Sequence, residues 1–224
     1  MKRAIVIALS VILALVVAMP MVSGKPTTTK QKPSPPGQLK KNLPDLTAEW
    51  WNWAASINPS PLQGSYTSPD PRCEGEYVEG VFFLAGSLAT DPETRTCTVP
   101  AHTPILFSPF NYLCSELFPE DLPPYDTCAR ENTQAVIDSP SSFYARVDGK
   151  DANQQRIASG LFQWTIPVDN FLGQDVPAGT YESAQDGLWV FLGKGLKRGE
   201  HTIEFGPLGS FEGAHITYKL TAVN

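Results

Sequence analysis

The sequence lacks the motifs of the common catalytic and metal sites. It has no G-x-S-x-G segment, which many serine hydrolases place around their nucleophile, and no C-x-x-C or H-x₃-H spacing of the kind that binds zinc. The only histidines, His102, His201 and His215, are far apart along the chain. We therefore predict that the protein uses no metal and no other cofactor.

Positive charge is scarce after residue 42. All 23 acidic residues follow that position, but only ten of the 17 lysines and arginines do, so this part of the chain carries a net charge of about −13. A protein that binds nucleic acid needs a basic surface for the phosphates. The charge distribution therefore excludes nucleic acid as a partner and is compatible with a soluble exported protein.

Long hydrophobic runs are also absent, apart from one at the N-terminus. After the basic start Met1–Arg3, residues 4–19 form a run of 16 residues without a charge, and small residues precede Lys25. A membrane-spanning helix needs roughly 20 apolar residues. We predict a signal peptide over residues 1–24 and secretion of the mature protein, with a membrane association only if this segment is retained.

Two regions follow the predicted signal peptide. Residues 25–42 are rich in Lys, Pro and Thr and contain no apolar cluster, which predicts a flexible linker. Residues 43–224 have the length of one domain with a substantial core.

The four cysteines lie within one window of 56 residues. An even number of cysteines in an exported chain indicates disulfides. Three pairings are conceivable, and we favour Cys73–Cys97 with Cys114–Cys128 because each of these closes a short loop.

From residue 77 onward, short segments of alternating or wholly apolar residues predict strands, separated by turn signals such as Asp148-Gly149 and Asp186-Gly187. We predict an all-β fold, an antiparallel β-sandwich of jelly-roll or immunoglobulin-like type. Residues 114–142 are predicted to be a long loop held by the second disulfide, with a weak helical signal over residues 128–137.

One short helix rich in tryptophan is predicted at the start of the domain, in "TAEWWNWAASI". Trp50, Trp53, Ala54 and Ile57 share one stripe of a helix with 3.6 residues per turn, and this stripe is expected to pack on the sandwich. Trp51 lies about 100° away on the flank. Its ring is expected to be partly exposed and available to a ligand.

Several blocks, "EWWNWAASINPSP", "GVFFLAGS", "TRTCTVPAHTPILFSPFNYLCSE" and "DGLWVFLGKGLKRGEHTIEFG", resemble a family of exported microbial β-rich proteins. The matching features are a WWxWA helix, an FLAG strand, an RxCxVP strand and a GxHTIxF hairpin. The resemblance implies export and a shared β-rich fold, and it implies no activity.

Candidate binding residues are aromatic or are polar residues within apolar runs. The predicted ligand-binding residues are Trp51, Tyr66, Asn111, Tyr112 and Tyr125, with a structural role for Asn111 as the alternative. Paired carboxylates, which a glycosidase needs, could come from Glu74, Glu76 and Glu79 or from Glu116, Glu120 and Asp121.

The sequence specifies compartment and architecture more closely than activity. We expect a non-enzymatic binding or scaffolding module at the cell exterior, whose partner is a glycan or another cell-surface component. Carbohydrate is the expected ligand class by analogy with other sandwich folds. The alternatives are a secreted polysaccharide hydrolase with a carboxylate pair and a subunit of a surface assembly.

Overall fold

The computed structural model describes residues 41–57, 77–78, 80–87, 91–138, 142–168, 170, 172, 176–208 and 215–224. The predicted signal peptide and nearly all of the predicted linker lie outside these ranges. Within them, no helix has both the length and the apolar character that crossing a membrane requires.

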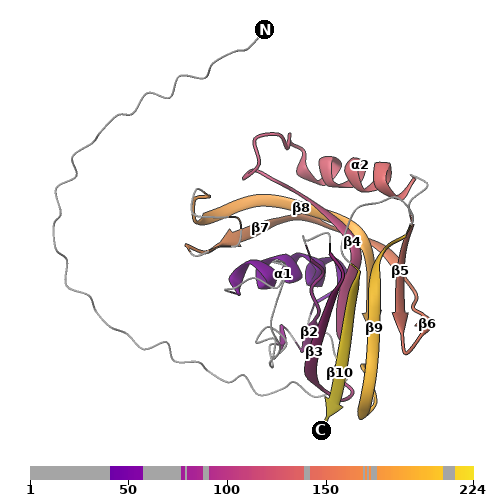
Figure 1. Cartoon of the computed structure of the whole chain (residues 1–224). Helices are drawn as coiled ribbons and strands as arrows, with labels where there is room; N and C mark the ends of the chain where they lie inside the picture. The colour runs from indigo at the N-terminus through magenta and orange to yellow at the C-terminus, as the bar shows by residue number, and fades with distance from the viewer. Residues whose placement is uncertain are drawn as a thin grey trace, which may run out of the picture. The chain divides into compact units, whose positions relative to one another are not determined.

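Within the described residues, ten strands form two sheets (Figure 1). The first sheet has the strand order β1 (Tyr77–Val78), β2 (Val81–Phe83), β4 (Ile105–Ser115), β8 (Gly179–Leu192) and β7 (Gln155–Ile166). The second has the order β3 (Glu93–Pro100), β10 (Ile216–Val223), β9 (Gly199–Leu208), β5 (Ser142–Val147) and β6 (Lys150–Asp151).

The two sheets pack against each other, so the predicted sandwich-like architecture is confirmed in its coarse form. The prediction that it is purely antiparallel is wrong, because β2 pairs in parallel with β4 and β10 pairs in parallel with β3. Between β2 and β4 the chain crosses to the second sheet as β3, so it returns to the first sheet in its original direction. Alternation in the sequence identifies a strand but does not reveal its neighbour.

The space between the sheets is filled by apolar side chains from every second position of the facing strands. Phe107 of β4 lies against Phe205 of β9, with their ring centroids 5.0 Å apart. The same core contains Phe82 and Val190 from the first sheet and Ile203 from the second.

The helix α1 (Leu43–Ser56) packs on the opposite face of the first sheet (Figure 1). Asn42 caps it by accepting a hydrogen bond from the amide of Asp45. The indole of Trp50 donates to the carbonyl oxygen of Leu84 over 2.9 Å, and Trp53 packs edge-on against Phe83. The predicted docking of this helix by Trp50 and Trp53 is therefore confirmed.

The expected exposure of Trp51 is wrong. This residue is 8% exposed and belongs to the same core cluster as its two neighbours. Trp164 of β7 lies beside the flank of the helix, packs edge-on against Trp51 and donates its indole N–H to the carbonyl oxygen of Trp51. A helical wheel treats the helix alone and so omits this strand.

A second helix, α2 (Tyr125–Ile137), occupies much of the segment predicted to be a loop. Its contacts are with β4, β8 and β7, and Figure 1 shows it on the side of β7 and β8 away from α1. The predicted disulfide Cys114–Cys128 is confirmed and joins β4 to α2, with a Cα–Cα distance of 6.0 Å. The other predicted pair includes Cys73, which lies outside the described residues.

Only one of the two predicted turn dipeptides forms a turn. Asp148-Gly149 is the two-residue turn between β5 and β6, with φ angles of 51° and 72°, as the type I′ hairpin turn requires. Asp186-Gly187 instead lies inside β8. A Cβ atom at Gly187 would lie 2.5 Å from the carbonyl oxygen of Phe110, so this glycine allows β4 and β8 to approach each other.

Candidate functional site

Two of the predicted ligand-binding residues, Tyr112 and Tyr125, lie close together beside the Cys114–Cys128 disulfide. Tyr112 comes from β4 and is half-buried, whereas Tyr125 is the first residue of α2 and is buried. The same small apolar cluster contains Ala129 and Ala184. We call the surface around these tyrosines, together with the acidic loop described next, the tyrosine face.

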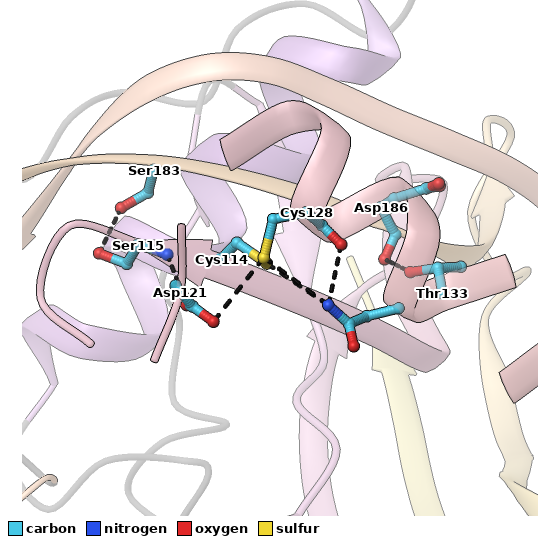
Figure 2. The surroundings of a disulfide bond; sticks show 8 residues. Cys114, Ser115, Asp121, Cys128, Thr133, Ser183 and Asp186 are labelled. Carbon is cyan, nitrogen blue, oxygen red and sulfur yellow. Dashed lines mark hydrogen bonds between the residues drawn. A yellow bond between two sulfur atoms is a disulfide. The ribbon is translucent and has the colours of Figure 1, made fainter. Parts of the chain in front are cut away.

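The loop between β4 and α2 brings acidic side chains to this face. Asp121 accepts a hydrogen bond from the amide of Ser115 over 2.8 Å, and the Ser115 hydroxyl lies 2.8 Å from that of Ser183 (Figure 2). Glu116 accepts a bond from the backbone amide of Glu182. Two members of the predicted carboxylate group, Glu120 and Glu116, remain exposed.

Burial and negative charge raise pKa values on the tyrosine face. The pKa of Asp121 is raised by burial, against the opposing effect of the Ser115 amide, and is raised further by the charge of Glu120. The pKa values of Tyr112 and Tyr125 are raised by burial and then by neighbouring carboxylates. The face therefore attracts protons or other cations rather than anions.

Cys114, Asp121 and Cys128 place three side-chain atoms within 4.8 Å of one another, a spacing that a metal ion could use. The two sulfur atoms are joined to each other in the disulfide (Figure 2). A disulfide sulfur is not a thiolate, and the thiolate is the form that ligates metals. This cluster therefore does not form a metal site while the disulfide is intact.

The other predicted binding residues do not join the tyrosine face. Asn111 is half-buried on β4 opposite Gly187, and strand alternation directs it to the face opposite that of Tyr112. Trp51, a residue of α1, is buried in the core between this helix and the first sheet. Tyr66 lies outside the described residues, as do the candidate acids Glu74, Glu76 and Glu79.

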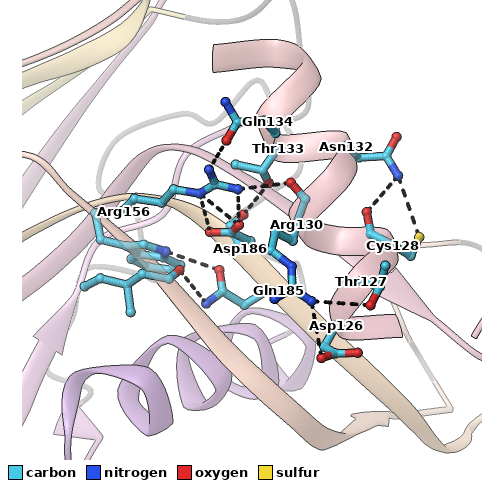
Figure 3. A network of polar contacts seen from close by, with 12 residues as sticks. Asp126, Thr127, Cys128, Arg130, Asn132, Thr133, Gln134, Arg156, Gln185 and Asp186 are labelled. Carbon is cyan, nitrogen blue, oxygen red and sulfur yellow. Dashed lines mark hydrogen bonds and ion pairs between the residues drawn. The ribbon is translucent and has the colours of Figure 1, made fainter. Parts of the chain in front are cut away.

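A polar network holds α2 on the sheet (Figure 3). The guanidinium of Arg156 on β7 forms a bidentate ion pair with Asp186 of β8, with Nε 3.2 Å from Oδ1 and Nη2 2.6 Å from Oδ2. It also donates to the carbonyl oxygen of Arg130 and contacts the Gln134 side chain, both on α2. Thr133 donates to the carbonyl oxygen of Asp186. The charged groups of Arg156 and Asp186 are bound to each other and to α2, which favours a structural role for this network.

A second candidate site, which the sequence did not indicate, is a groove of about 420 Å³ beside the β5–β6 hairpin. It is lined by Val147, Asp148, Lys150, Asp151, Ala152, Asn153, Val190, Phe191 and Leu192. The pairing of β7 with β8 begins at Gln155 and Trp189, so residues 190–192 of β8 extend beyond β7. The groove lies between this extension of the first sheet and the hairpin of the second.

The chain segment that crosses between the sheets is fixed by hydrogen bonds. The amide of Ala152 donates to the carbonyl oxygen of Ala145 over 2.8 Å. The side chain of Gln154 donates to the carbonyl oxygen of Phe143. The groove wall is thus part of the folded framework, and a preformed wall lowers the ordering cost of binding.

The charged groups of the groove are mostly paired. Asp148 accepts hydrogen bonds from the Thr202 amide at 2.9 Å and from His201 at 2.8 Å, and Asp151 pairs with Arg146 at 3.1 Å. Burial alone would raise the pKa of Asp148, but these bonds from Thr202 and His201 outweigh it and lower that pKa. Lys150 makes no ion pair within the described part of the chain, although its charge acts on Asp148.

Sequence reasoning missed this groove because its residues come from separate segments that meet only after folding. The one local signal was Asp148-Gly149, which predicts a hairpin turn and no ligand. The position of residues 190–192 depends on where β7 stops pairing, and no sequence pattern marks that point.

No protein-family model matches the chain, and neither the curated proteins nor the solved structures provide a match. The resemblance to exported β-rich proteins therefore remains a prediction from the quoted blocks.

Proposed function

We propose that the protein is an exported, non-enzymatic binding module and that the groove beside the β5–β6 hairpin holds a carbohydrate. The observation that carries this proposal is the composition of the groove. Its walls combine the half-buried apolar residues Val147 and Leu192 with the polar side chains of Asp148, Lys150 and Asn153. A sugar ring offers apolar C–H faces and hydroxyl groups, so it matches both parts of this lining.

The volume supports a small ligand. Ligand pockets usually enclose about 300–1,000 Å³, and the groove has about 420 Å³. Lys150 supplies a charge without an ion-pair partner among the described residues, whereas Asp148 and Asp151 are both paired. A saccharide that carries a carboxylate would pair with Lys150, so acidic oligosaccharides are the best-fitting class.

The carboxylates of the groove favour binding over hydrolysis. A glycosidase needs one carboxylic acid with a raised pKa as the proton donor. The pKa of Asp148 is lowered, so this group stays ionised. Asp151 is an exposed member of an ion pair with Arg146. The groove can therefore accept hydrogen bonds from hydroxyl groups, and Asp148 is not suited to donate a proton.

Calorimetric titration of the full chain with trigalacturonate and maltotriose tests the proposal. We expect trigalacturonate to bind and Lys150→Ala to weaken its binding about tenfold, because one charge-assisted contact is worth roughly 1.5 kcal/mol. Lys219→Ala, which removes an exposed lysine of β10 outside the groove lining, is the matched control and should leave binding unchanged. Equal effects of both substitutions, or no binding of either trisaccharide, would refute the proposal.

A secreted hydrolase is the second candidate, and the tyrosine face is the observation that favours it. There the pKa of Asp121 is raised, as a general acid requires, and Glu116 and Glu120 belong to the same loop. Release of new reducing ends from polygalacturonate, abolished by Asp121→Asn, would support this candidate over the binding module.

A further inference from the structure

His201 of β9 has a hydrogen-bond acceptor at each ring nitrogen. Its Nδ1 lies 2.8 Å from a carboxylate oxygen of Asp148, and its Nε2 lies 2.8 Å from the carbonyl oxygen of Lys197. An ionised carboxylate and a backbone carbonyl can only accept hydrogen bonds. Both ring nitrogens must therefore carry a proton, so this arrangement requires the imidazolium form of His201.

The charges around His201 favour that form. Asp148 approaches from the β5–β6 turn, and Glu200 precedes His201 on the same strand. The positive charge of Lys150 acts on Asp148, and the loop before β9 presents the carbonyl oxygen of Lys197 to Nε2 of His201. On the neighbouring strand β10, the residue opposite His201 is the apolar Leu220. Burial alone would lower the pKa of His201, but the bonds to Asp148 and Lys197 and the nearby negative charges raise it.

Asp148, which accepts a hydrogen bond from His201, also lines the groove. Asp148 has a positive φ of 51°, which a non-glycine residue adopts at some cost. Its carboxylate is fixed by the Thr202 amide and by His201, and its own amide donates to the carbonyl oxygen of Thr202. Because Asp148 lines the groove, the bond from His201 fixes both the turn and one polar group of the proposed binding site.

We propose that His201, as an imidazolium, is a positioning residue for the groove, so that ligand binding weakens when His201 loses its proton. This inference rests on the proposed function of the groove. In neutral His201 only one ring nitrogen carries a proton, so the bond to Asp148 or the bond to Lys197 is lost. A positive charge next to the groove is lost at the same time, which further weakens the binding of an anionic saccharide.

The protonation of His201 can be read without any ligand. Long-range ¹H–¹⁵N spectra of the histidine rings, recorded across a pH titration of the ¹⁵N-labelled chain, distinguish the imidazolium from the two neutral tautomers. We expect the titration midpoint of His201 to lie above the ordinary value of 6.5, and Asp148→Asn to lower it. His215, which contacts the Tyr144 hydroxyl, is the internal reference, and its signals should not respond to Asp148→Asn. A midpoint at or below 6.5 would overturn the inference.

Binding is then measured with trigalacturonate at pH values on both sides of the His201 midpoint. The affinity of the wild-type protein should fall by about tenfold or more as pH rises through that midpoint, as expected for one charge-assisted contact. His201→Gln should bind weakly with a flat pH profile. An unchanged pH profile in His201→Gln shows that His201 does not position the site, even if the groove binds. Absence of binding at every pH, with an intact imidazolium, refutes the proposed function and with it the positioning role.

Discussion

The burial of Trp51 depends on a residue more than a hundred positions away. The helical pattern of "EWWNW" correctly indicates that Trp50 and Trp53 dock α1, because both rings lie on the stripe that faces the sheet. Trp51 lies outside that stripe and is buried all the same, because Trp164 of β7 covers it. The spacing of residues within a helix predicts the contacts of its main face, but it cannot predict a contact made by a distant strand.

We expect Trp51→Ala to lower the free energy of unfolding by about 3–5 kcal/mol, the usual cost of truncating a buried aromatic residue to alanine. Trp53→Ala should cost a similar amount, because Trp53 is also buried. Urea denaturation monitored by circular dichroism measures both. A Trp51→Ala variant as stable as the wild type would contradict the packing of β7 against α1.

The helix α2 shows how far an element can be predicted from its own sequence. The proline- and acid-rich segment before it resembles a loop, and the helical signal indicates only its second part. The Cys114–Cys128 disulfide could be predicted because it closes a short loop of the chain. The Arg156–Asp186 pair that docks the helix joins residues 30 positions apart, and no local pattern connects them.

At the scale of this element, Arg156→Ala should loosen α2. Asp186 is 3% exposed in its side chain, so removal of Arg156 leaves a buried carboxylate without its cation. We expect a loss of about 3 kcal/mol in unfolding free energy and faster hydrogen exchange of the α2 amides. Arg130→Ala removes the arginine of an exposed pair with Asp126, and this control should cost less than about 1 kcal/mol. Equal costs would show that the network does not dock the helix.

For the whole molecule, alternation in the sequence predicts the strands and the two packed layers. It does not predict which strands run in parallel, because that depends on how often the chain crosses between the sheets. The groove arises at another crossing between the sheets, where the chain leaves the β5–β6 hairpin for β7. The candidate tyrosines could be named from the sequence, whereas the groove residues could be found only in the folded chain.

The stability of the molecule should depend on pH through His201 and Asp148. The folded-state pKa of His201 is raised, so its contribution is complete below the ordinary value of 6.5 and is lost as pH rises through the raised pKa. The pKa of Asp148 is lowered, so its contribution is present above the ordinary value of 3.8 and is lost as pH falls through the lowered pKa. The pair therefore stabilises the fold most between these two limits.

Thermal unfolding of the wild type and of His201→Gln, compared from pH 5 to pH 9, measures this effect. We expect the variant to be less stable by about 1–2 kcal/mol at pH 5–6, and the difference should shrink as pH rises. A difference that stays constant with pH would mean that the charge of His201 does not stabilise the fold.

The proposed function depends most on the groove as the binding site, and chemical-shift mapping tests this site directly. Trigalacturonate is added to the ¹⁵N-labelled protein at pH 6, and the amide signals are followed during the titration. We predict that the shifted signals belong to residues 147–153 and 190–192. Shifts centred on Tyr112, Asp121 and Tyr125, or no shifts at all, would contradict binding in the groove.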